Sequence, residues 1–254
     1  MPKLLILSCF FLSTSCFSQK RLSALVPKPK ESFKIINSDI LVLDTLVMAD
    51  SSNIILDEFS KENFIHVKWA KIGYRCTIDG SGKNGLKGMP GRHGLNGNSL
   101  CANGRDGKNG ENGSAGEDGK NLSLYLNEIL INGSLIVYLQ GGDGGNGGDG
   151  GDGSPKSKNC TGGSGGNAGN GGNGGDGGKG GTLSVFGERE QDLFAFSKDL
   201  VCVNLGGKMG LGGKRGFAGK TGYDPTKDDI LKHNGNSGEN GVRGIQGSLI
   251  IELK

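Results

Sequence analysis

Apolar and polar residues alternate over the segment 33–79, the first part of the chain with a clear period. Within it, Phe64–Ala70 places Ile65, Val67 and Trp69 on one side and polar residues between them. A period of two, together with β-branched residues, is typical of β-strands. We therefore expect a strand-rich segment over 33–79, either as a separate domain or as part of a larger sheet.

From residue 80 onward the period changes to three, because glycine occupies every third position in six runs. The runs, numbered one to six here, are Gly82–Gly97, Gly104–Gly119, Gly141–Gly153, Gly162–Gly181, Gly207–Gly222 and Gly235–Gly247. Runs one and two, three and four, and five and six are separated by short polar breaks. The remaining connections and the C-terminus are apolar segments, which are Leu122–Gln140, Thr182–Leu205 and Ser248–Leu253. This alternation predicts hairpins that return to a common base of strands.

A period of three matches the polyproline-II helix, which has no internal hydrogen bonds and needs partners for its amides. Glycine at every third position leaves a bare face along which another backbone can lie. We therefore predict a mainly β or irregular fold over 80–254: short β-strands form a base, and six antiparallel polyproline-II helices form three glycine-rich hairpins. Runs three and four are written Gly-Gly-X, with two bare faces, and should lie between the other runs.

Two other interpretations of the glycine runs remain open. A collagen triple helix would carry much more proline in unbroken triplets, and here only Pro90 lies within a run. Disorder is common in polar, glycine-rich chains. The matched lengths of the runs and the recurring strands favour a folded bundle over both.

On these runs the chain resembles the N-terminal domain of Obg-type GTPases, and the bundle is similar to snow-flea antifreeze proteins. The sequence is also collagen-like. The resemblance covers roughly residues 76–254, rests on periodicity and implies a fold, not an activity. The segment 213–221 ends in Gly-Lys-Thr, but position 214 is Lys214 where a phosphate-binding loop needs glycine, so nucleotide binding is not expected.

The N-terminal residues 1–18 have the pattern of a secretory signal peptide, with Lys3 followed by a short apolar stretch. They resemble signal peptides of Bacteroidota-type bacteria. Cleavage between Ser18 and Gln19 is one expectation; lipidation at Cys16 is the alternative. The basic, proline-containing stretch 19–32 is predicted to be a linker. The protein is thus expected to be exported and extracellular or associated with an outer membrane of a Gram-negative bacterium.

Export changes the interpretation of the cysteines. Of six in the chain, four lie beyond the signal: Cys76, Cys101, Cys160 and Cys202. An even number in an oxidising compartment indicates disulfides. Cys101 and Cys160 fall in the distal turns, and Cys76 and Cys202 fall in strands before runs one and five. We predict the bonds Cys101–Cys160 and Cys76–Cys202.

Candidate chemistry along the chain is sparse. Asp224, Asp228 and Asp229 form a local acidic turn that is a candidate metal site, although a solvated loop explains it as well. The three histidines have no zinc-ligand spacing. No catalytic residue and no cofactor is predicted.

The formal net charge of +3 gives no basis for nucleic-acid binding. No segment has the roughly 20 apolar residues that a membrane-spanning helix needs. The expected function is that of a non-enzymatic structural or interaction protein, with a protein partner at the cell surface or outer membrane. A free adhesin and a glycan-binding or ice-binding module are the alternatives, and an enzyme is the least favoured.

Overall fold

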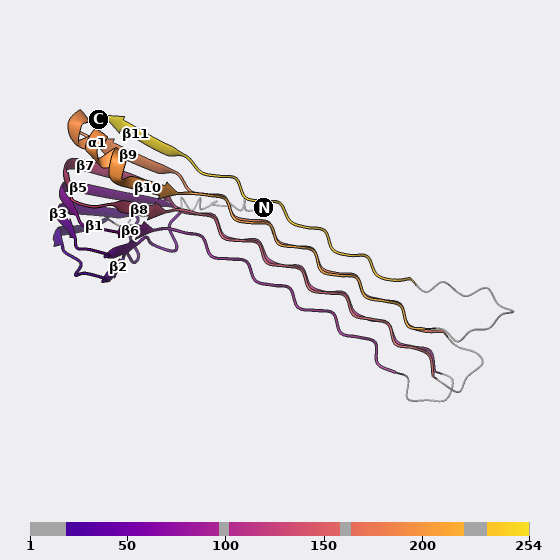
Figure 1. Cartoon of the computed structure of the whole chain (residues 1–254). Helices are drawn as coiled ribbons and strands as arrows, with labels where there is room; N and C mark the ends of the chain where they lie inside the picture. Colours follow the sequence, from indigo (N-terminus) through magenta and orange to yellow (C-terminus); the bar gives the residue numbers. More distant parts are fainter. Residues whose placement is uncertain (1–18, 97–101, 158–163, 221–232, 254) are drawn as a thin grey trace, which may run out of the picture.

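The structure is a computed structural model that describes residues 19–96, 102–157, 164–220 and 233–253. It contains a base of parallel β-sheets, from which the glycine runs extend as a long slab (Figure 1). In one sheet, called sheet A, the strands are β1 (Gln19–Leu25), β3 (Ile40–Met48), β5 (Glu62–Ile72), β7 (Asn121–Ile131), β9 (Leu183–Gly187) and β11 (Leu249–Leu253). In the other, sheet B, they are β2 (Ser32–Lys34), β4 (Asn53–Ile55), β6 (Cys76–Asp79), β8 (Leu135–Tyr138) and β10 (Leu200–Val203).

The strands alternate between the two sheets along the chain, so the base winds as a solenoid with two strands in each turn. All pairs are parallel. The inward positions of successive strands form columns; Leu41, Ile65, Leu124 and Val185 make one of them in sheet A. These four side chains are at most 2% exposed, so the core lies between the two sheets.

The fold class predicted from the sequence is wrong. We expected short strands as a base for six antiparallel polyproline-II helices, whereas the structure has parallel sheets of six and five strands and one α-helix. Strands also cover most of residues 19–79, and these strands belong to the same sheets and the same core as the later ones. The physical reason is that apolar alternation gives full strands such as β5, and the long connections between them permit parallel pairing.

The predicted linker is also structured in part. Gln19–Leu25 forms β1 at the edge of sheet A, where it pairs with β3. Leu25 is buried in the core at the end of this strand. This strand was not predicted because Lys20 and Arg21 interrupt the alternation of apolar and polar residues. An edge strand tolerates such residues, since it needs fewer apolar positions than a central strand.

The glycine runs are assigned to neither helix nor strand, and their backbones are held by hydrogen bonds at every third residue. Runs one, three and five form one layer: Gly88 of run one donates to the carbonyl of Asn146 at 2.8 Å, and Gly147 of run three donates to Leu211 at 2.8 Å. Runs two, four and six form a second layer with the same spacing. Each layer continues the ladder of one sheet, sheet B for the odd runs and sheet A for the even runs.

Hydrogen bonds also join the two layers. Gly148 of run three donates to Glu111 of run two at 2.8 Å, and Gly172 of run four donates to Gly148 at 2.8 Å. Runs three and four therefore have neighbours in their own layer on both sides and across the slab. The prediction that the two Gly-Gly-X runs lie between the others is confirmed by these bonds. We refer to the described residues of the six runs as the glycine slab.

One helix, α1 (Glu190–Asp199), connects β9 to β10 at the end of the base away from the slab (Figure 1). The apolar residues of this segment predicted a strand here, and this prediction is wrong for α1. Its signals are Glu190 and Asp192 in the first turn and Lys198 in the last, an arrangement that suits the helix dipole. Phe196 is the buried residue of α1 and belongs to the core between the sheets.

Candidate functional site

Several predicted site residues lie outside the described part of the chain. These are Cys16 and Ser18 in the N-terminal segment, Cys101 between runs one and two, Cys160 between runs three and four, and Asp224, Asp228 and Asp229. Gln19, the predicted first residue after cleavage, is the first residue of β1. The predictions that involve the undescribed residues stay predictions.

The predicted Cys76–Cys202 disulfide is not formed, since both cysteines are free thiols. Cys76 begins β6 and Cys202 lies in β10, and β8 separates these strands in sheet B. Two strand spacings alone separate the Cα atoms by about 9–10 Å, and Cys202 also lies two residues beyond the position in register with Cys76, whereas a disulfide bridges roughly 7 Å at most. The strand order, which the sequence did not reveal, therefore excludes the bond. Burial raises the pKa of both thiols, so they are protonated at neutral pH.

The acidic and amide side chains of the slab act as structural hydrogen-bond acceptors. The Oδ1 atom of Asp143 accepts from the backbone N–H of Lys208 at 2.7 Å, and Oδ1 of Asn170 accepts from Asn236 at 2.8 Å. The same contact recurs along the layers at three-residue intervals; its acceptors include Asn84, Asp106, Asn109, Asn112, Asp118, Asn146, Asp149, Asp152, Asn173 and Asp176. These side chains are thereby fixed to the neighbouring backbone.

The histidines are used in a similar way. Nδ1 of His93 accepts from the backbone N–H of Asp152 at 2.9 Å, and Nε2 of His66 lies 3.0 Å from Oδ1 of Asn127. Within the described ranges, no three His, Cys, Asp or Glu side chains are grouped so that they could hold a metal ion.

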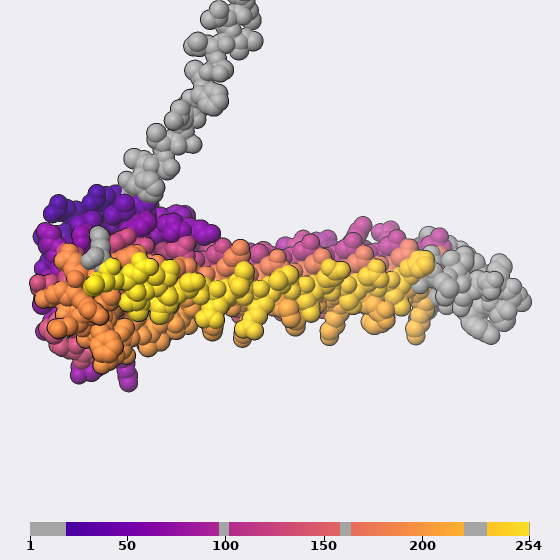
Figure 2. Space-filling model, turned by 90° about the horizontal axis from the view of Figure 1, so that it is seen from above, coloured from indigo at the N-terminus to yellow at the C-terminus, as the bar shows by residue number. Residues whose placement is uncertain are grey.

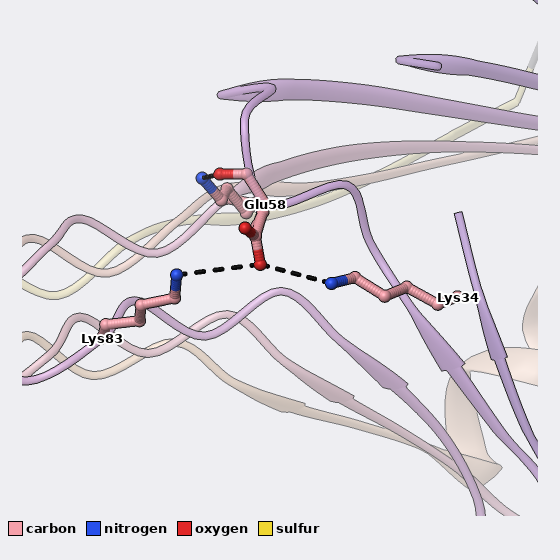
Figure 3. A network of polar contacts seen from close by, with 4 residues as sticks. Lys34, Glu58 and Lys83 are labelled. Atoms are coloured by element: carbon pink, nitrogen blue, oxygen red, sulfur yellow. Dashed lines mark hydrogen bonds and ion pairs between the residues drawn. The ribbon is translucent and has the colours of Figure 1, made fainter. Parts of the chain in front are cut away.

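A cluster of charges joins the base to the slab. Glu58, in the connection between β4 and β5, accepts from the ammonium of Lys34 at 3.2 Å and lies 3.7 Å from the ammonium of Lys83 in run one (Figure 3). Lys120, at the end of run two, donates to the backbone carbonyl of Glu58. The hydrogen bond from Lys34, then the charges of Lys34 and Lys83, hold the pKa of Glu58 below its usual value.

This lowered pKa gives the junction a defined response to acid. Because the pKa of Glu58 is lower in the folded than in the unfolded protein, its stabilising effect is complete above the unfolded pKa of about 4.3 and is lost as the pH falls through the folded pKa. We expect Glu58→Gln to lower the urea midpoint at neutral pH, by a small amount because the carboxylate is exposed. The difference from the native protein should disappear at the acid end of a titration of the midpoint.

Two lysine variants complete this experiment. Lys34→Met removes the main partner of Glu58 and should produce the same loss at neutral pH. Lys87→Met removes a lysine of run one that has no ion pair among the described residues, and should leave the midpoint unchanged. A Glu58→Gln midpoint that differs from the native one equally at every pH would contradict the assignment.

A shallow groove of about 740 Å³ crosses the face of the odd layer near the base. Asn84, Asp143 and Asn146 line it, but their Oδ1 atoms already bind backbone N–H groups. Lys87, Lys208 and Arg243 add positive charge, and Met209 and Leu211 add apolar surface. The groove lacks aromatic side chains for stacking against a sugar ring, since none lines it.

The most distinctive surface is the C-terminal edge of the molecule, which we define as α1, β10, β11 and runs five and six. Figure 2 shows it as the yellow and orange side that runs from the base along the slab. More than half of the exposed large apolar side chains in the described ranges lie here: Phe194, Val201, Met209, Leu211, Phe217, Val242, Ile245, Leu249, Ile250, Ile251 and Leu253. An exposed apolar surface of this extent is typical of an interaction site.

The base of this edge contains a groove of about 560 Å³ between α1 and β11. Leu193, Phe194 and Ile251 supply its apolar lining, and Glu190 and Ser197 supply polar groups. None of these groove residues was predicted to be functional, because their exposure depends on the strand order and on the position of α1. A usable signal was the unbroken apolar sequence Leu249–Ile251 beside the last glycine run.

No protein-family model, curated protein or solved structure matches this chain. Helix α1 has ten residues, and no helix in the described ranges is both long and apolar enough to pass through a bilayer.

Proposed function

We propose that the protein is an exported, non-enzymatic structural and interaction protein of the bacterial outer surface, in which a solenoid base carries a rigid glycine slab. One observation carries this proposal: the backbones of the slab interlock so closely that side chains are excluded between them. A Cβ atom added to Gly148 would lie 2.0 Å from the carbonyl oxygen of Met89 in the adjacent run. Such a slab suits a spacer or a scaffold.

The use of polar side chains supports a structural role. The Oδ1 atoms of Asp143, Asn146 and Asp149 each accept a hydrogen bond from a backbone N–H group of run five. Glu58 forms ion pairs that join the slab to the base. These are the residue types from which catalytic and metal sites are built, and here they maintain the architecture.

The proposed location follows from residues 1–18, whose pattern is that of a secretory signal, and the apolar C-terminal edge supports a protein as the partner. The partner would belong to an outer-membrane or cell-surface assembly. Adhesion without a fixed assembly is the alternative form of the same role.

Cell fractionation and protease treatment of intact cells test this proposal in a Gram-negative host. We expect the chain in the outer-membrane or extracellular fraction, where externally added protease removes it. Small-angle scattering of the purified protein should give an elongated, rigid particle. A chain that remains in the cytoplasm, or one that scatters as a flexible coil, would overturn the proposal.

A further inference from the structure

Both sheets of the base end in strands with an unpaired edge. β1 and β2 lie at one end, and β11 and β10 lie at the other. At the second end the core is open: Leu249 and Ile251 are 47% and 37% exposed, although Leu183 and Val185, their neighbours in register on β9, are 0% exposed. Repeat proteins normally cover such an end with a polar capping unit, and the described residues provide none here.

The opposite end offers a surface that can cover it. All strands are parallel, so the free edge of β1 has the direction required to pair with the free edge of β11 in another molecule. A second copy that is shifted along the solenoid by six strand positions would therefore continue sheet A. Sheet B has five strands, so the same shift leaves one strand position open between β10 and β2 of the next copy.

The columns of the sheets give the register of this continuation. Arg21 and Glu252 stand at the two ends of one outward column of sheet A. Lys20 and Ile251 end the adjacent inward column. Gln19 and Ile250 end another outward column of sheet A.

Charge complementarity supports this register. Arg21 of one copy would lie beside Glu252 of the next, and Arg21 is 66% exposed with only a 3.9 Å contact to Asp44. Lys20, whose ammonium lies 5.3 Å from the ring centre of Phe33, would face the α1–β11 groove, to which Glu190 contributes a carboxylate. Its methylene groups can cover Ile251 while the ammonium reaches that carboxylate.

We propose that a second copy of this chain docks by the free edge of its β1 on the free edge of β11 of the first, so that sheet A continues from one molecule to the next. The interface is heterologous, because it joins different surfaces of the two copies. Repetition of such a contact gives linear assemblies. The inference rests on the proposed structural function and names the partner of the base part of the C-terminal edge.

A disulfide across the interface tests the proposal directly. Adjacent parallel strands place paired Cα atoms about 4.8 Å apart, which a disulfide can bridge. We expect a chain with both Gln19→Cys and Ile250→Cys to form an intermolecular bond between these two positions, seen as a ladder of multimers on a non-reducing gel and as a 19–250 peptide by mass spectrometry. Within one copy these residues are five strand spacings apart, about 24 Å, so an intramolecular bond cannot form.

Controls make the result unambiguous. Gln19→Cys alone and Ile250→Cys alone should give no such ladder. Both positions are exposed and lie on edge strands, so neither substitution should disturb the fold. Ile251→Lys should weaken association of the full chain about tenfold in sedimentation equilibrium.

A chain that stays monomeric at all concentrations without the 19–250 bond would overturn the inference. So would bonds between identical positions, 19–19 or 250–250, because they indicate a symmetric dimer. A monomeric but rigid chain at the outer surface would leave the proposed function intact. Conversely, stacking by a chain found in the cytoplasm would contradict the proposed function alone.

Discussion

Replacing Gly148 with alanine is expected to open the middle of the slab. The added methyl group would lie 2.0 Å from the carbonyl oxygen and 2.4 Å from the carbonyl carbon of Met89, closer than any real contact. Runs one and three would have to separate, which would break nearby bonds such as that from Gly88 to Asn146. We expect a loss of about 3–5 kcal/mol in the free energy of unfolding, from overpacking and lost hydrogen bonds together.

Urea unfolding followed by circular dichroism would measure this loss. Lys87→Ala in run one is the control: it changes a side chain of the same slab at a solvent-exposed position and should alter stability by less than about 0.5 kcal/mol. Native stability in Gly148→Ala would show that runs one and three are not in close contact in solution.

Replacing Phe196 with alanine should have a comparable effect on the base. Phe196 is 0% exposed and packs into the core beside Met48 and Leu135. Removal of a fully buried phenylalanine side chain costs about 3–5 kcal/mol, because it loses apolar contacts and leaves a cavity. Loss of this anchor should also release α1 and expose the end of the core.

Phe194→Ala is the matched control, since Phe194 lies two residues earlier in the same helix and is 64% exposed. It should change the midpoint of thermal unfolding little, whereas Phe196→Ala should lower it by several degrees. Equal effects of the two substitutions would mean that α1 is packed differently from the structure described here.

The sequence predicted the local features well where a short period determines them. Ile65 and Val67 alternate as expected, and both are buried in β5. The Gly-Gly-X pattern predicted that runs three and four have more neighbours than the others, and the contacts of Gly148 with runs one, two and four agree. In both cases the period of the sequence equals the period of the contacts.

Features that depend on long-range order were not predicted. The strand order of sheet B keeps Cys76 and Cys202 apart, and nothing local in the sequence specifies that order. Parallel pairing was missed for the same reason. The role of Asn170 as a hydrogen-bond acceptor was also not predicted. A polar residue at the X position of a glycine triplet could equally be solvated, and only the position of the neighbouring run shows which backbone N–H group it binds.

The three hairpins enter the solenoid at equivalent places, each between a strand of sheet B and the following strand of sheet A. The number of turns with a hairpin therefore sets the width of the slab, whereas the number of triplets in each run sets its length, and the two can change independently in evolution. Duplication of one solenoid turn with its hairpin would widen the slab by one pair of runs and repeat the same kind of contact between neighbours. Insertion of a triplet into all six runs would lengthen it by up to about 10 Å. A triplet gained by a single run would instead place the distal glycines of that run opposite the wrong residues of its neighbours. We therefore expect the slab to grow only by whole solenoid turns, or by one triplet in all six runs together.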